Sequence, residues 1–74
     1  MKILMKTVKP ALLNFAQSVL NDADIPWFVM DNNMSLLEGS IGIIPRRLMV
    51  IEDDYEEAVS VLIAAELKDE LFRG

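Results

Sequence analysis

The sequence predicts an α+β fold in which a three-stranded sheet carries two helices on one face. Strand-length runs rich in β-branched and aromatic residues occur at 2–8, 26–30 and 46–51. Segments with the apolar spacing of an amphipathic helix begin near Pro10 and Asp53. The predicted order is therefore strand, helix, strand, strand, helix. With 74 residues, the chain is expected to form a single domain, residues 1–74.

The first strand, residues 2–8, is too short for a helix before Pro10. Period-two alternation places Lys2 and Lys6 on one face. The other face then holds Ile3, Met5 and Thr7. This alternation is typical of a sheet with one face in water.

The first helix is expected to begin at Pro10, since proline suits the first helical turn. It should end before Pro26, because the residue preceding a proline favours extended geometry. One apolar stripe runs along it: Leu12, Phe15, Ala16, Val19, Leu20 and Ala23.

The second helix is expected to be capped by Asp53 or Asp54, with Asp54 and Glu57 matching a capping box. Glu56 and Glu57 lie in its first turn, where negative charge meets the positive end of the helix dipole. Its buried stripe should comprise Tyr55, Ala58, Val61, Leu62 and Ala65. Val59 and Ile63 lie off this stripe, which indicates a second packing surface on the helix.

The first two strands are separated by a helix, so they should be parallel, with the third strand between them and antiparallel to both. This arrangement is a ferredoxin-like βαββα layer. The tail, residues 68–73, either adds a short fourth strand beside the first strand or extends the second helix; we favour a short extended piece that packs Leu71 and Phe72.

Hydrophobic residues make up 53% of the chain, which is rich for a domain with so much surface. Some apolar area is therefore expected to be covered by another subunit or by a partner, and we expect a homo-oligomer. The candidate interface residues are Val59, Ile63, Leu71 and Phe72.

Composition excludes several classes of function. The chain has no Cys and no His, so thiolate chemistry, the usual neutral-pH base and the commonest zinc ligand are missing. An enzyme would have to work with carboxylates, Tyr55 and arginine, and we expect no catalytic residues, metal or cofactor. A net charge of −5 disfavours nucleic-acid binding. No apolar run approaches a membrane span, and a cytoplasmic location is expected.

The segment at 31–47, DNNMSLLEGSIGIIPRR, is a long connection for a compact domain. In the simpler interpretation, Leu36, Leu37 and Ile41 plug one end of the sheet. In the functional interpretation, exposed amides and two arginines form an anion pocket. The candidate ligand-binding residues are Asn32, Asn33, Gly39, Ser40, Gly42, Arg46 and Arg47.

Other candidate features also have two interpretations. Adjacent arginines on a strand point to opposite faces, and pairing of Arg46 and Arg47 with Glu38, Glu52 or Asp53 is simpler than ligand binding. The acidic run that starts at Glu52 is better explained by helix capping than by a divalent cation. Trp27 is more readily a core or interface residue than a stacking platform.

Several short sequence features are spread over nearly the whole chain. They are the turn Ala23–Asp24–Ile25, the connection marked by Asp31, Asn33 and Gly39, the strand Leu48–Met49–Val50, and Glu52–Asp53–Asp54 before the second helix. In these features the chain resembles a small bacterial family of unknown function described as prokaryotic signal-transducing proteins. The resemblance implies a ferredoxin-like sheet grouped with nitrogen-regulatory signalling proteins, and it supplies no catalytic residues. The chain departs from the family pattern at Lys9, where an acidic or amide cap is common, so the first helix should lack a good N-cap.

Two functional expectations follow. The first is a non-enzymatic, cytoplasmic binding or signal-transducing module that contacts a partner protein or a small anion through the 31–47 connection. The alternative is a purely structural, homo-oligomeric interaction domain with no ligand.

Overall fold

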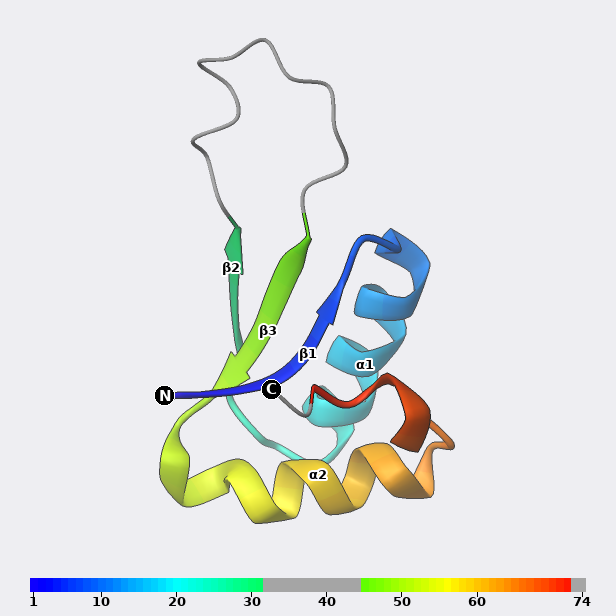
Figure 1. The fold of residues 1–74 in the computed structure, drawn as a ribbon. Helices are drawn as coiled ribbons and strands as arrows, with labels where there is room; N and C mark the ends of the chain where they lie inside the picture. The colour runs from blue at the N-terminus through cyan, green and yellow to red at the C-terminus, as the bar shows by residue number, and fades with distance from the viewer. Residues whose placement is uncertain (32–44, 73–74) are drawn as a thin grey trace, which may run out of the picture.

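The computed structural model describes residues 1–31 and 45–72. Within these ranges the α-helices and strands are β1 (Lys2–Thr7), α1 (Pro10–Asp22), β2 (Phe28–Asp31), β3 (Arg46–Val50) and α2 (Tyr55–Ala64). Two short 3-10 turns follow β3 and α2, namely η2 (Glu52–Asp54) and η3 (Lys68–Glu70). The predicted α+β, ferredoxin-like βαββα order is confirmed (Figure 1).

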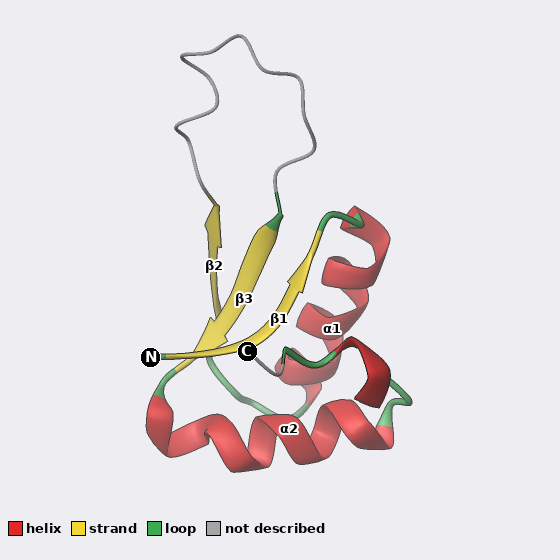
Figure 2. Ribbon diagram, in the orientation of Figure 1, coloured by secondary structure: helices red, strands yellow, loops and turns green. Residues whose placement is uncertain are grey.

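The sheet has the order β1-β3-β2, and β3 is antiparallel to both neighbours. Because β3 occupies the middle, β1 and β2 run parallel without bonding to each other. Figure 2 shows α1 alongside the strands and α2 crossing beneath them. The topology predicted from the sequence is therefore confirmed.

A β-bulge at Leu4 corrects the predicted alternation of the first strand. Ile3 pairs with Met49 and Met5 with Leu48, so Leu4 is an extra residue with no partner on β3. Cross-strand partners share a face, so the shift puts Ile3 and Met5 on opposite faces. It likewise separates Lys2, whose Nζ lies 4.8 Å from the ring centre of Tyr55 on α2, from Lys6.

The core lies between the helices and the face of the sheet that holds Leu48 and Val50. Its buried residues are Leu4, Met5, Leu13, Ala16, Leu20, Ile25, Leu48, Val50, Ala58, Leu62 and Leu67. Both helices contribute to this one cluster, which confirms that they cover the same face of the sheet.

The apolar stripe predicted for α1 is wrong at one position. Leu13, which was not predicted, is buried, whereas Phe15, which was predicted, is 50% exposed. Pro10 is the first helical residue, as predicted. Lys9 stands at the N-cap without a side-chain hydrogen bond to the helix, which agrees with the missing cap expected from the sequence. Its own backbone N–H donates to Thr7 Oγ1 at 3.0 Å.

Both helices end in a Schellman motif with an acidic residue in the left-handed conformation. After α1, Asp24 has φ 59°, and the Ile25 N–H donates to the Leu20 carbonyl at 2.9 Å. After α2, Glu66 has φ 67°, and the Leu67 N–H donates to the Leu62 carbonyl at 2.9 Å. Each motif buries the apolar pair that usually accompanies it, Ile25 with Leu20 and Leu67 with Leu62.

The capping box predicted for α2 is absent. Asp54 is the N-cap residue, but it has helical backbone angles and makes no side-chain capping bond. The turn η2 precedes the helix instead, and its Asp54 N–H donates to the Ile51 carbonyl at 3.0 Å. A capping side chain requires an extended residue just before the helix. Here the chain enters α2 as a continuing turn, so the side chain of Asp54 does not cap the N-terminal amides.

The tail does not extend α2, which ends at Ala64. It passes through η3 and returns to β1, where Leu71 forms a single bridge with Met5. The Phe72 N–H donates to the Leu4 carbonyl at 2.8 Å. The tail is therefore a short extended piece beside β1, held by one bridge at the bulge.

Candidate functional site

One face of the sheet is left uncovered by the described elements, and we call it the open face. Two cross-strand rows define it: Ile3, Met49 and Phe28, followed by Lys6, Arg47 and Met30. Phe28 is 43% and Met30 47% exposed. The open face therefore combines exposed apolar side chains with a basic row.

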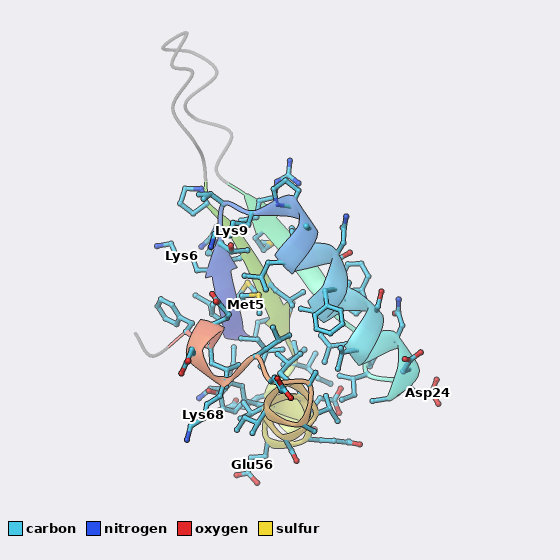
Figure 3. The ribbon with its side chains drawn as sticks, turned by 90° about the vertical axis from the view of Figure 1, so that its right-hand side faces the viewer. Met5, Lys6, Lys9, Asp24, Glu56 and Lys68 are labelled. Carbon is cyan, nitrogen blue, oxygen red and sulfur yellow. The ribbon has the colours of Figure 1, made fainter. Side chains whose placement is uncertain are left out.

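Basic residues gather where β1 ends and β3 begins. Lys6 pairs with Arg47 across the two strands, and Thr7 pairs with Arg46 in the next row. Lys9 follows β1, and Figure 3 shows Lys6 and Lys9 near the same end of the sheet, with Asp24 and Glu56 at the far end. We call Lys6, Lys9, Arg46 and Arg47 the basic end.

The basic end raises the local electrostatic potential of an acidic protein. Side chains directly opposite on neighbouring strands have Cβ atoms about 5 Å apart, and like charges so placed are destabilising. Lys6 and Arg47 are such a pair. An anion bound between them would offset their repulsion, and guanidinium presents the planar donor pair that carboxylates and phosphates accept.

The arginines do not pair with the acids that follow β3. Arg46 and Arg47 begin this strand, whereas Glu52 and Asp53 come after its end. At about 3.3 Å per residue, the intervening strand separates Arg47 from Glu52 by about 17 Å. The predicted pairing with Glu52 or Asp53 is therefore excluded within one chain, and Glu38 lies outside the described residues. Arg46 does have an interaction partner in the structure.

The 31–47 connection begins and ends at the basic end. Asp31 and Arg46 are register partners at the end of β2 and the start of β3, so the chain leaves and re-enters the sheet at the same end of this strand pair. The remaining predicted ligand-binding residues lie outside the described residues: Asn32, Asn33, Gly39, Ser40 and Gly42. Of the predicted set, Arg46 and Arg47 are placed by the structure, and it puts Lys6 beside them.

Comparison with known families gives one match, which covers residues 1–66 and carries the description "Putative prokaryotic signal transducing protein". The chain belongs to this family. The fold, the basic end and the open face all lie within the matched residues, as far as the structure describes them. A comparison with curated proteins gives no match.

The interface residues predicted for this member of the signal-transducing family fall into two groups. Val59 and Leu71 are partly buried and pack against the chain's own core. Ile63 and Phe72 remain 42% and 36% exposed. Phe72 lies beyond the residues that match the family. The outer surface of α2 is therefore less apolar than its sequence suggested.

Trp27 packs against the core and is only partly buried. Its indole Nε1 donates to Oδ1 of Asn21 at 2.8 Å, which ties the last turn of α1 to the segment leading into β2. These contacts support the interpretation of Trp27 as a packing residue.

In residues 1–31 and 45–72, no group of three or more acidic side chains is arranged to hold a metal ion. The carboxylates that follow β3 are exposed or half-exposed in η2 and the first turn of α2. Neither helix in this part of the chain is long and apolar enough to cross a membrane.

Sequence reasoning predicted that one face of the sheet is in water, but it missed the apolar row on that face. Phe28 and Met30 alternate with Val29 along β2, and Met49 lies between Leu48 and Val50 on β3. This alternation separates a core side from an outer side. The alternation therefore contained the information needed to predict the apolar row. Using it requires knowing that both helices cover the side of the sheet that holds Leu48 and Val50.

Proposed function

We propose that this chain is a non-enzymatic, cytoplasmic signal-transducing module that binds a small anion or an acidic segment of a partner protein where the 31–47 connection meets the sheet. The observation that carries the proposal is the cross-strand pairing of Lys6 with Arg47, beside Arg46 and Lys9. Family membership supports the signalling role.

The distribution of charge supports an anionic ligand. The net charge of the chain is −5, yet basic residues are concentrated at one end of the sheet. A protein with this net charge repels anions at long range, so a local basic cluster must act at short range by hydrogen bonding and ion pairing. Selective recognition of an anion therefore depends on the geometry of these few side chains.

The connection supports the choice of location. Both of its ends are fixed to the sheet at the basic end by the pairing of Asp31 with Arg46. A ligand contacting Arg46 or Arg47 therefore lies beside the first and last residues of the connection. Binding there would be sensed by a segment that covalently joins β2 to β3.

A second candidate function is a structural homo-oligomer without a ligand. Several large apolar side chains are exposed, among them Phe28, Met30, Ile63 and Phe72. Exposed apolar patches are typical of surfaces that meet another protein. In this candidate function the basic end contributes only to the solubility and orientation of the assembly.

Thermal unfolding with inorganic phosphate, pyrophosphate and citrate distinguishes the two functions. A ligand present at 100 times its Kd stabilises the folded state by about 2.7 kcal/mol, which corresponds to a rise in Tm of roughly 10–20 °C for a domain of this size. Arg47→Ala should remove most of the anion-dependent increment, and Arg46→Ala, whose side chain points to the other face of the sheet, should remove less of it. Each variant is compared with itself without anion, because Arg46 already has an interaction that its loss would remove.

Lys68→Ala is the matched control, since it also removes one exposed positive charge, but from η3, away from the basic end (Figure 3). It should keep the full anion-dependent increment. If none of the anions raises Tm, or if Lys68→Ala lowers the increment as much as Arg47→Ala does, the anion site is refuted.

A further inference from the structure

The open face consists of an apolar row beside a basic row. The rows are Ile3, Met49 and Phe28, which we call the Met49 row, and Lys6, Arg47 and Met30, which we call the Arg47 row. Phe28, Met30 and Lys6 are exposed, and the other three residues are half-buried. An occupant that buries this face must therefore supply apolar contacts and negative charge at neighbouring positions.

The spacing of the two rows fits the rise of an α-helix. Arg47 and Met49 lie two positions apart on β3, so the rows are separated by about 7 Å along the strand. Four residues of an α-helix rise about 6 Å, and side chains at i and i+4 lie on the same face of the helix. A helix aligned with β3 can therefore place an apolar residue on the Met49 row and a carboxylate one turn away on the Arg47 row.

The size and the chemistry of the face both favour a helix as the occupant. Three strands about 4.8 Å apart and the five residues of β3 at about 3.3 Å each give a face of roughly 14 by 17 Å. An α-helix is about 10–12 Å wide, and about eleven helical residues cover this length. An extended segment on the Met49 row would leave backbone N–H and C=O groups without partners, whereas a helix bonds them internally.

We propose that the open face binds an amphipathic α-helix of a partner protein. The apolar stripe of this helix lies on the Met49 row, and Asp or Glu side chains in its adjacent turn bind Lys6 and Arg47. The inference rests on the proposed function, since it takes the acidic segment of a partner protein as the ligand of the basic end. It adds the conformation of that segment and the surface that recognises it.

Charge selects an acidic partner over a face-to-face pair of this chain. The Met49 row and the Arg47 row contain no acidic residue, so the open face of a second copy offers no carboxylate to Lys6 or Arg47. Two such faces laid together would bury these cations unpaired or set them against each other, and both arrangements are unfavourable. The net charge of −5 also repels an anionic lipid surface at long range, which disfavours a membrane.

Two synthetic peptides serve as probes. Each is a fluorescently labelled helix of about fourteen residues built from Ala, Gln and Leu, with Leu at i, i+3, i+4 and i+7. The glutamate peptide carries two Glu residues one turn beyond this stripe, and the lysine peptide carries two Lys residues there. A lactam bridge on the polar face holds both peptides helical, because helices of this length are marginal alone.

Fluorescence anisotropy of each peptide, titrated with the full chain, measures the affinity. The Kd of the glutamate peptide should be lower than that of the lysine peptide by about tenfold or more, because like charges across an interface repel. Stable complexes bury about 800 Å² on each partner, which is more than one short helix covers on this face. The complex should therefore dissociate readily on dilution.

One pair of variants tests the apolar row. Phe28→Ser should raise the Kd of the glutamate peptide about fivefold or more, because it removes an exposed aromatic anchor from the Met49 row. Phe15→Ser is the matched control, since Phe15 has a similar exposed fraction but lies on α1. It should change this Kd by less than about twofold. Circular dichroism and Tm of each variant establish that it is folded.

A second pair of variants tests the basic row. Arg47→Ala should reduce the preference for the glutamate peptide to less than about threefold, and a general loss of stability would leave this ratio unchanged. Lys68→Ala, which removes a positive charge from η3, should keep the full preference. Pyrophosphate should weaken binding of the glutamate peptide to wild type more than to Arg47→Ala, because both ligands use the same guanidinium.

The peptide and anion measurements together separate the inference from the proposed function. Equal affinities for the two peptides, or equal affinities of wild type and Phe28→Ser for the glutamate peptide, overturn the inference. If anions raise the Tm of wild type and the glutamate peptide does not bind, the inference falls and the anion site stands. If the peptide binds as expected and no anion raises Tm, the inference stands and the small-anion site falls.

Two further measurements test the other occupants. A dimer that forms in sedimentation of wild type and is lost in Phe28→Ser would assign the open face to a second copy. Phosphatidylglycerol vesicles that bind wild type and not Phe28→Ser would assign it to a membrane. Either result overturns the inference.

Discussion

Trp27 donates its indole N–H to Oδ1 of Asn21, with 2.8 Å between Nε1 and Oδ1. The bond joins the end of α1 to the residues that enter β2. Asn21 is exposed, so this restraint on the turn can be removed without changing the core.

The first prediction concerns this bond. Asn21→Ala should lower the free energy of unfolding by about 0.5–1.5 kcal/mol, the usual net value of one hydrogen bond. Trp27→Phe keeps an aromatic ring and removes the donor, so a double-mutant cycle of denaturant unfolding isolates the bond. A coupling free energy near zero would show that Asn21 acts only through the helix.

The second prediction concerns the left-handed residues that end both helices. Asp24→Gly and Glu66→Gly should each raise the free energy of unfolding by about 0.5–1 kcal/mol, because glycine adopts positive φ without a Cβ clash. For a domain of this size that is a rise in Tm of roughly 2–8 °C. Asp22→Gly, inside α1, is the control and should lower Tm.

The third prediction concerns the start of α1. Lys9 occupies the N-cap in an extended conformation, but its side chain cannot accept a hydrogen bond from the helix. Lys9→Ser should therefore stabilise the protein by about 0.5–1.5 kcal/mol in thermal or urea unfolding. Lys9→Ala removes the same charge without providing a cap. If both variants gained equally, charge removal near the helix dipole would be the cause.

The fourth prediction concerns the tail. Deletion of residues 71–74 removes the bridge from Leu71 to Met5, the bond from Phe72 to the Leu4 carbonyl and the packing of Leu71 on the core. The free energy of unfolding should fall by about 1–3 kcal/mol, from one hydrogen bond and one partly buried leucine. Deletion of residues 73–74 alone is the control for shortening the chain. Equal stability of the two deletions would show that the bridge contributes nothing.

The sequence was sufficient for the topology. Pro10 and Pro26 bracket the first helix, and the apolar periods change on either side of them. Once a helix separates the first two strands, few arrangements of a three-stranded sheet remain. The order β1-β3-β2 follows from these constraints.

Local departures from regular geometry were not predictable in the same way. Leu4 and Met5 are both apolar, so the sequence does not mark which of them is the inserted residue of a bulge. In the sequence, Asp54 and Glu57 have the spacing of a capping box. In the structure, η2 gives Asp54 helical backbone angles that preclude the cap. In both cases tertiary packing decides between local alternatives.

The candidate site was predicted in part. Adjacency on a strand correctly assigned Arg46 and Arg47 to opposite faces, and the register confirms it through their partners Thr7 and Lys6. The importance of Lys6 was not visible, because it depends on the one-residue shift at Leu4. Most of the other predicted ligand-binding residues lie in the part of the chain that the structure does not describe.

The central position of β3 has a consequence for the order in which the protein folds. Neither β1 nor β2 can make its hydrogen bonds until β3 exists, and β3 ends at Val50 of a 74-residue chain. During synthesis, the segment that precedes β3 therefore cannot complete the sheet, and cooperative assembly waits for a late, non-local event. Until then, the residues of β1 and β2 have no central strand to pair with and are open to chaperones or to neighbouring polypeptides.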